Sequence, residues 1–182
     1  MVESIETLQG VGPPDLTVLS VLLAARMVLM AGQAATPAEA EQLVRRALAS
    51  GDGLARFRQM VARQGGDVSV VDDPSRLALA SGREIVRAAR AGYVTGLDAM
   101  LVGRAAAALG AGRATADDRI DHGVGIKVLA TPGALVRAGE PILELYHRDS
   151  LGLRDAVGLA GQAIELGAAP PMPLPLMVGE IV

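Results

Sequence analysis

The pattern of apolar residues changes near residue 70 of the 182-residue chain, and this change limits the folds that the chain can adopt. Before that point apolar residues recur at helical spacing, and no strand signal separates the segments. After it, short apolar runs are interrupted by glycines, which is typical of strands and turns. The sequence therefore predicts an α+β chain with two parts, residues 1–70 and residues 71–182.

The most apolar stretch of the chain, residues 16–32, is predicted to be a buried helix. Asp15 can cap this helix, which then runs to about Met30 and is closed by Gly32. The stretch is short of the roughly 20 residues that a bilayer requires, and Arg26 lies in its middle. It also lacks the basic start of a signal peptide. We therefore expect no membrane segment and a cytoplasmic protein, which the absence of cysteine also fits.

Two further helices are expected in the first part. Thr36 and Glu39 form a capping box at the start of one, and Gly51 ends it. The other spans about 53–63 and stops at a pair of glycines. Three helices form a poor core by themselves, so residues 1–70 are interpreted as the tail of a larger domain. Their exposed apolar faces predict self-association or a partner, and a homo-oligomer stays open.

The second part follows a linker at residues 68–77 and mixes strands with helices. Short strands are expected within 82–97, followed by an alanine-rich helix at 100–112 that Gly110 stops. Two strands are then expected around a turn at Pro132–Gly133, with a second turn at Ala138–Gly139. A final helix at 153–167 and an extended proline-rich tail at 170–182 complete the chain.

Charge and composition exclude several classes of function. The net charge is −3 at pH 7 and acidic and basic residues are interspersed, which argues against a nucleic-acid partner. The chain has no cysteine, so disulfides, thiolate catalysis and cysteine-ligated zinc are excluded. No P-loop and no G-x-G-x-x-G, G-x-S-x-G or H-E-x-x-H motif occurs. On spacing alone the chain has no credible active site.

Two glycine clusters are also poor candidates for phosphate binding. In the segment GVGPPD, residues 10–15, Pro13 and Pro14 remove two of the N–H groups that would hold the anion. In the segment LGAGR, residues 109–113, the glycines follow a helix, and the dipole at that end repels anions. Neither cluster is therefore assigned a ligand.

The two histidines and the single lysine are the remaining candidates for chemistry. Asp121 and His122 are neighbours along an extended segment, so their side chains point to opposite faces and do not form an acid–base pair. His147 lies 25 positions later, which is not a spacing typical of metal ligands. Lys127 lies in an alternating apolar run, so it is interpreted as a strand residue that faces solvent. A lipoyl- or biotin-carrier lysine would instead stand at a hairpin tip.

Two segments carry a resemblance to a known family. ARAGYVTGLDAMLVGRAAAALGAGR, residues 89–113, and DDRIDHGVGIKVLATPGALVRAGEPILELYHRD, residues 117–149, resemble the C-terminal domain of the thymidine phosphorylase and pyrimidine-nucleoside phosphorylase family. Upstream, VESIETLQGVGPPDLTVLSVLLAARMVLMAG, residues 2–32, is similar to helices of the same enzymes. The resemblance covers nearly the whole chain, but only the second half of such an enzyme.

This resemblance implies a fold and an activity. Residues 1–70 would be the helical C-terminal part of the phosphorylase catalytic domain. Residues 71–182 would be its C-terminal domain, an α/β-hammerhead with a barrel-sandwich-like unit. The family converts a pyrimidine nucleoside and phosphate to the free base and a pentose 1-phosphate, by positioning and by charge stabilisation. Its Lys-x-Ser-x-Gly-Gly phosphate loop and its Ser-x-x-x-Lys base-reading pair do not occur here, since Gly123 precedes Lys127 by four residues.

No residue of this chain is therefore assigned as catalytic or substrate-binding, and no organic cofactor is expected. By resemblance, Glu3 is a ligand of a monovalent cation in the complete enzyme, in a site that this chain leaves incomplete. The chain is expected to be inactive alone and to need the N-terminal half or a partner chain. The alternatives are the second subunit of a split phosphorylase and a non-catalytic hammerhead that serves as a binding or carrier module.

Overall fold

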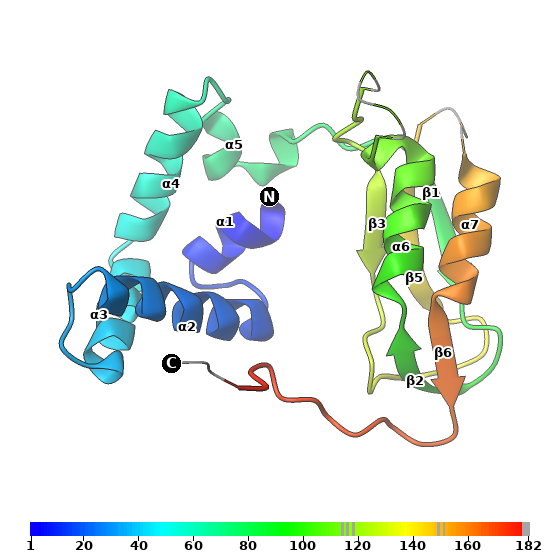
Figure 1. Cartoon of the computed structure of the whole chain (residues 1–182). Coiled ribbons are helices and arrows are strands. Elements are labelled where there is room, and N and C mark those ends of the chain that lie inside the picture. The colour runs from blue at the N-terminus through cyan, green and yellow to red at the C-terminus, as the bar shows by residue number, and fades with distance from the viewer. Residues whose placement is uncertain (114, 116, 118, 149, 151, 180–182) are drawn as a thin grey trace. The chain divides into compact units, whose positions relative to one another are not determined.

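The computed structural model describes residues 1–113, 115, 117, 119–148, 150 and 152–179, and it shows a mixed α and β chain (Figure 1). The chain divides into two compact units. One unit contains Met1–Arg76 together with the C-terminal stretch that starts at Pro175, and the other is Leu77–Leu174. The first unit is helical, and the described strands all lie in the second.

The helical unit contains four helices of two turns or more, followed by a short helical connection. In chain order these elements are α1 (Val2–Leu8), α2 (Pro14–Met30), α3 (Pro37–Ala49), α4 (Asp52–Arg63), the single-turn α5 (Ser69–Asp72) and the 3₁₀ turn η1 (Pro74–Arg76). The last two lie in the segment that was expected to be a linker. The stretch from Pro175 to Gly179 has no helix or strand and contains a bend at Leu176, and residues 180–182 of the tail, which was predicted to be extended, lie outside the described residues.

The predicted capping box of α3 is confirmed, with one shift. The Glu39 backbone N–H donates to Thr36 Oγ1 at 3.2 Å, and Glu39 Oε2 accepts from the N–H of Ala35, one residue before the cap, at 2.9 Å. The glycines that were predicted to end α2 and α3, Gly32 and Gly51, both have positive φ, at 67° and 80°. Local side-chain chemistry therefore sets these helix ends.

The prediction that Asp15 caps α2 is wrong. The helix begins at Pro14, with Pro13 in the cap position, because the fixed φ of proline suits the first helical residue and its missing N–H is not needed there. Asp15 lies inside the first turn, where its Oδ1 accepts from the N–H of Leu16 at 2.8 Å. A carboxylate in that turn is still favourable for the helix dipole.

The helical unit has little core of its own. Among its described residues, only a few apolar side chains are fully buried: Ile5, Val21, Ala25, Ala40 and Val71. Helix α2 is apolar around its whole circumference, so Met27 and Met30 on its outer side are 70% and 87% exposed while Val21 on the opposite side is buried. A helix without a polar face is normally covered on all sides.

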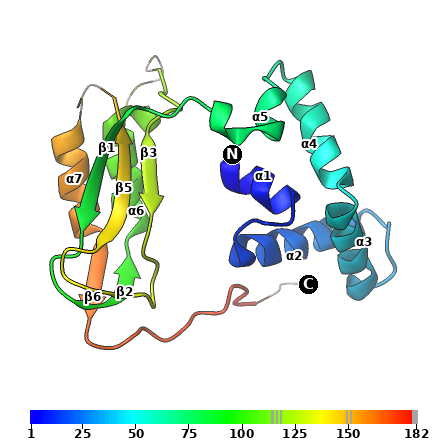
Figure 2. The same ribbon diagram turned by 180° about the vertical axis from the view of Figure 1, so that it is seen from behind.

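The second unit contains two antiparallel three-stranded sheets. One sheet has the order β1 (Gly82–Arg87), β5 (Pro141–His147), β3 (Gly125–Val128), and the other has the order β4 (Leu135–Val136), β2 (Gly92–Leu97), β6 (Ile164–Gly167). Figure 2 shows β5 lying between β1 and β3. The register pairs Gly82 with His147 in the first sheet and Tyr93 with Gly167 in the second.

The strands predicted around Pro132–Gly133 do not pair with each other. The turn itself is present, with Gly133 at φ 97°, but β3 pairs with β5, whereas the short β4 between them pairs with β2. Successive strands of this segment thus alternate between the two sheets. Apolar alternation gives the face of each strand but not its neighbour, so the sequence did not predict this arrangement.

Two helices complete the second unit, and the prediction for one of them is partly wrong. Helix α6 (Ala99–Ala106) continues into a wider turn, η2 (Ala107–Ala111), and Gly110 stops it at φ 100°, as predicted. Helix α7 spans only Leu153–Gln162, because residues 164–167, expected to be helical, form strand β6 on the edge of β2. The pairing of Ile164–Gly167 with β2 outweighs local helix propensity.

The core of the molecule lies in this second unit. Leu143 and Leu145 of β5 are fully buried, together with alanines of the two helices such as Ala105 and Ala156. Small side chains let α6 and α7 approach closely. A Cβ atom at Gly152, which precedes α7, would lie 1.9 Å from the carbonyl oxygen of Ala108.

The glycines of α7 give a first test of this packing. We expect Gly152→Ala to lower the free energy of unfolding of the second unit by about 1–3 kcal/mol, since the residue has φ 65° and no room for a methyl group. Gly158→Ala should raise it by about 0.5–1 kcal/mol, because this position is inside α7 and open to solvent.

The measurement is urea unfolding followed by tyrosine fluorescence. Both tyrosines, Tyr93 and Tyr146, lie in the second unit and the chain has no tryptophan, so the signal reports on this unit alone. Equal stabilities of the Gly152→Ala and Gly158→Ala variants would contradict the close approach of Ala108 and Gly152.

Candidate functional site

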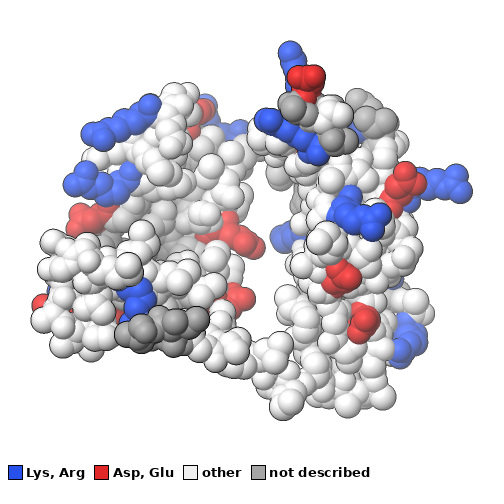
Figure 3. Space-filling model, in the orientation of Figure 1, with Lys and Arg blue, Asp and Glu red and all other residues white. Residues whose placement is uncertain are grey.

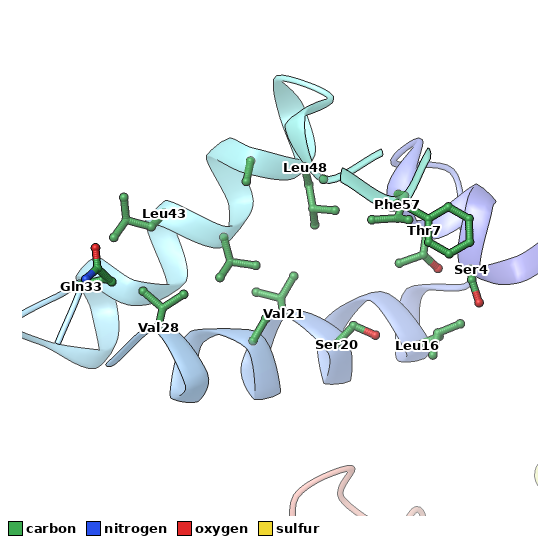
Figure 4. A pocket seen from close by; sticks show the side chains of 15 residues that line it. Ser4, Thr7, Leu16, Ser20, Val21, Val28, Gln33, Leu43, Leu48 and Phe57 are labelled. Atoms are coloured by element: carbon green, nitrogen blue, oxygen red, sulfur yellow. The ribbon is translucent and has the colours of Figure 1, made fainter. Parts of the chain in front are cut away.

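An apolar groove lies between the helices of the helical unit. The groove has a volume of about 690 Å³. Helix α2 forms one wall and α3 the other, with residues of α1 and α4 at one end (Figure 4). Its lining residues are Ser4, Thr7, Leu8, Leu16, Ser20, Val21, Ala24, Val28, Gln33, Leu43, Val44, Ala47, Leu48, Gly53 and Phe57.

The lining of the groove is apolar and uncharged. None of the lining residues carries an ionisable side chain, so no group in the groove can transfer a proton or act as an activated nucleophile. The large apolar side chains, such as Leu16, Leu43 and Phe57, are only half-buried. They therefore offer uncovered apolar surface.

The first glycine cluster packs against the same helices. A Cβ atom at Gly12 would lie 2.3 Å from Thr7 Oγ1, so glycine is required at this position for close approach to α1. Pro13, the next residue, has no N–H and precedes the first turn of α2. The interpretation that this cluster does not hold a phosphate fits these contacts, and the cluster has a packing role instead.

Asp121 is the centre of a structural network at one end of the second unit. Its backbone N–H donates to the carbonyl oxygen of Gly110 at 3.0 Å, and its Oδ1 accepts from the N–H of Gly123 at 2.9 Å. Its Oδ2 accepts from Arg148 Nε at 2.6 Å, and Oδ1 accepts from Arg148 Nη2 at 3.3 Å. Asp121 therefore ties the end of η2 to the end of β5, through its backbone N–H on one side and its carboxylate on the other.

The same network reaches the start of the second unit through Gly123. The carbonyl oxygen of Gly123 accepts from the N–H of Ala80 at 2.7 Å, and a Cβ atom at Gly123 would lie 2.6 Å from the carbonyl oxygen of Ala78. The hydrogen bonds from Arg148, and next those from Gly123, hold the pKa of the Asp121 carboxyl below its ordinary value. Asp121 thus stays ionised as a structural anchor.

The other candidate residues, His122, Lys127 and His147, do not line the groove. His122 is exposed beside Asp121. Lys127 is exposed in the middle of β3, opposite Glu144, which confirms its prediction as a strand residue that faces solvent. His147 packs against Gly82 on the neighbouring strand, and its Nδ1 is buried without a hydrogen-bond partner among the described residues. A metal would require further ligands there.

Sequence analysis missed a polar cluster on the β1–β5–β3 sheet. Glu144 accepts from Arg83 Nη1 and from the Tyr146 hydroxyl, both at 3.0 Å, and the Arg83 guanidinium lies 4.9 Å from the centre of the Tyr146 ring. Burial raises the pKa of the Tyr146 phenol, and the hydrogen bond to Glu144 raises it further. The alternation Glu144–Leu145–Tyr146 shows that these side chains share a face, but not that β1 lies beside them.

Charge and metal chemistry point to no further site among the described residues. Acidic and basic side chains are interspersed on the face shown in Figure 3. Glu3, the predicted cation ligand, is exposed in the first turn of α1, and the described residues contain no group of three or more acidic or histidine side chains that could hold a metal. A carboxylate suits a hard cation, but one carboxylate does not make a site. No helix in the described part of the chain is long and apolar enough to cross a bilayer.

Comparison with known proteins decides which family this framework resembles. Residues 93–167 match the family described as pyrimidine nucleoside phosphorylase C-terminal domain. This stretch of the chain is therefore similar to the C-terminal domain of pyrimidine nucleoside phosphorylases. The match begins at Tyr93 in β2 and ends with the last residue of β6, so it includes both α6 and α7.

The similarity to pyrimidine-nucleoside phosphorylases extends into the helical unit. The chain is 40% identical over 166 residues to the enzyme of Staphylococcus haemolyticus, which covers 91% of this chain and 38% of that relative. It is 43% identical over 144 residues to the enzyme of Bacillus subtilis and 41% identical over 144 residues to that of Geobacillus stearothermophilus, which covers 79% of this chain and 33% of each relative. The chain therefore spans between a third and two fifths of the relatives' length.

The Asp121 network of the second unit is testable by pH. Because the folded pKa of Asp121 lies below the unfolded value of about 3.9, its contribution to stability is complete above about pH 5 and is lost as the pH falls through the folded pKa. We therefore expect Asp121→Asn to lower the urea midpoint of the second unit at pH 7. The difference from the parent protein should shrink below about pH 4.

A matched control separates this network from a general charge effect. Glu84→Gln removes an exposed carboxylate of β1 in the same unit, and its urea midpoint should stay close to that of the parent protein. A pH-independent difference between Asp121→Asn and the parent protein would contradict the role of the ionised carboxylate.

Proposed function

We propose that this chain supplies the C-terminal part of a pyrimidine-nucleoside phosphorylase, the class of enzyme that converts a pyrimidine nucleoside and phosphate to the free base and a pentose 1-phosphate. The observation that carries this proposal is the identity of 40–43% to such enzymes over 144–166 residues. An alignment of 166 residues includes most of the helical unit as well as the C-terminal domain. Both units therefore belong to the proposed function.

In this proposal the chain is inactive alone. Phosphorolysis requires cationic or N–H groups that hold phosphate against the anomeric carbon of the nucleoside. The groove of the helical unit has no ionisable lining residue, and Lys127 stands on an exposed sheet face. The groups that grip phosphate and base therefore come from the N-terminal part of the enzyme, either as the other half of one enzyme or as the partner of a split phosphorylase.

The second unit acts as a framework in this proposal. Its two interleaved sheets, with α6 and α7 packed together, support the α/β-hammerhead assignment, and the Asp121 network stiffens one end of it. The boundaries proposed for the two domains are 1–70 and 71–182. Glu3 would contribute one carboxylate to a monovalent-cation site whose other ligands lie in the N-terminal part.

The alternative of a carrier module has less support. A modified lysine has to swing between sites, so it stands at the tip of a hairpin. Lys127 is in the middle of β3, away from the turns at Pro132–Gly133 and Ala138–Gly139, and neither of these turns joins two strands that pair with each other. Non-catalytic binding remains the outcome if no complementing partner exists.

The decisive experiment is complementation of phosphorolysis. The purified chain with thymidine or uridine and phosphate should release no base above a protein-free control. Co-expression with the N-terminal part of the Bacillus subtilis relative, which precedes the region matched here, should give base release. Release of base by the chain alone would overturn the proposal, and so would a folded complex of both parts that has no activity.

A further inference from the structure

We propose that the groove between α1, α2, α3 and α4 is the docking site for an amphipathic helix from the N-terminal part of a pyrimidine-nucleoside phosphorylase. This inference rests on the proposed function and names the surface through which the two parts of the enzyme meet. The surface is defined by the lining of the groove, with Val21, Ala24 and Val28 on α2 and Leu43, Val44 and Ala47 on α3.

The apolar surface of α2 and of the groove walls is not covered by the rest of the helical unit. Helix α2 has no polar face, and α3 covers only part of it, so one side ends in the groove and the other side leaves Met27 and Met30 exposed. Apart from the buried Val21, the leucine, valine and phenylalanine side chains of the groove walls are half-buried. A contiguous apolar surface rimmed by polar residues such as Ser4, Ser20 and Gln33 is typical of an interaction site.

The shape and volume of the groove fit a helix. Two helices that form the walls of an apolar groove accept a third amphipathic helix, which inserts side chains at every third or fourth position. A helix about 11 Å wide fills roughly 500 Å³ per turn, so the groove of about 690 Å³ takes the inward half of a helix over roughly two to three turns. The absence of charged lining residues matches the apolar face of such a helix.

The helix that occupies the groove comes from outside the described part of this chain. No described residue of the chain beyond Phe57 lines the groove, so the described part of the tail, residues 175–179, does not fill it. The relatives contain 62–67% of their length outside the region matched here, as the aligned shares of 38% and 33% show. This unmatched part is available to supply the helix.

A second copy of this chain fits the groove poorly. A two-fold dimer that places groove against groove leaves a void between two concave surfaces. Insertion of the outer face of α2 into the groove of another copy would bring Met27 and Met30 of one molecule against the groove of the next, and the alkylation experiment below detects this arrangement. The complementary part of the enzyme is therefore the occupant that closes the surface.

The test uses a pair of alanines on one helix. Ala47 of α3 lines the groove and is half-buried, whereas Ala49, two residues later, is exposed and outside it. The full chain is co-expressed with a tagged N-terminal part of the Bacillus subtilis relative, and retention on the tag is measured. We expect Ala47→Arg to reduce retention about tenfold or more, since it places a charge in the apolar lining of the groove, and Ala49→Arg to leave it unchanged.

A second measurement does not depend on the folding of the Ala47→Arg variant. The chain has no cysteine, so Ser20→Cys places one thiol in the groove, and Ala49→Cys places one outside it. The rate of alkylation by N-ethylmaleimide is followed through the mass of this chain. The tagged N-terminal part should slow alkylation of Ser20→Cys about tenfold or more and leave that of Ala49→Cys unchanged.

The outcomes separate this inference from the proposed function. If phosphorolysis is restored but Ala47→Arg is retained and Ser20→Cys stays reactive, the groove proposal fails while the proposed function stands. If the parent chain is not retained at all, both fail. If alkylation of Ser20→Cys already slows with rising concentration of this chain alone, the occupant is a second copy and the inference is overturned.

Discussion

An α-helix that is apolar on every side needs neighbours on every side, and α2 has them on only part of its surface. Val21 and Ala25 are buried against the rest of the helical unit, whereas Met27 and Met30 remain in water. The cluster of buried residues that forms the core of the molecule runs from Ala80 to Ala160, entirely within the second unit. The interpretation of the helical unit as part of a larger domain follows from this contrast.

The second unit buries its apolar side chains and pairs its polar groups internally to a greater degree than the helical unit does. Leu143 and Leu145 are covered by two alanine-rich helices, and the polar end of the unit is held by Asp121 and Arg148. The pair Asp121–His122 suggests catalysis only while the hydrogen-bond partners of Asp121 are unknown. The Asp121 carboxylate accepts hydrogen bonds from Arg148 and Gly123, so a structural role accounts for this charged residue and no proton transfer is needed to explain it.

Features that depend on neighbouring residues were predictable from the sequence. The Thr36 capping box and the glycines that end α2 and α3 are fixed by local hydrogen bonds and by positive φ. The strand position of Lys127 follows from alternation alone.

Features that depend on distant partners were not predictable in this way. Residues 164–167 continue a helical pattern, and only the edge of β2, some seventy positions earlier, turns them into a strand. The groove was equally hidden, because the sequence predicts apolar helix faces but not which faces stay uncovered when the helices pack. The all-round apolar character of α2 was the one signal that could have located it.

The interleaved sheets also affect how the protein is made. Strand β1 has to wait for β5, about sixty residues later, and β2 gains its β6 neighbour only when Gly167 has left the ribosome. The hairpin of α2 and α3 needs no such delay, because it involves only local contacts. A nascent chain that stalls between these two points exposes the open edges of β1 and β2 to other chains, so interrupted translation is the stage at which this protein is most prone to aggregate.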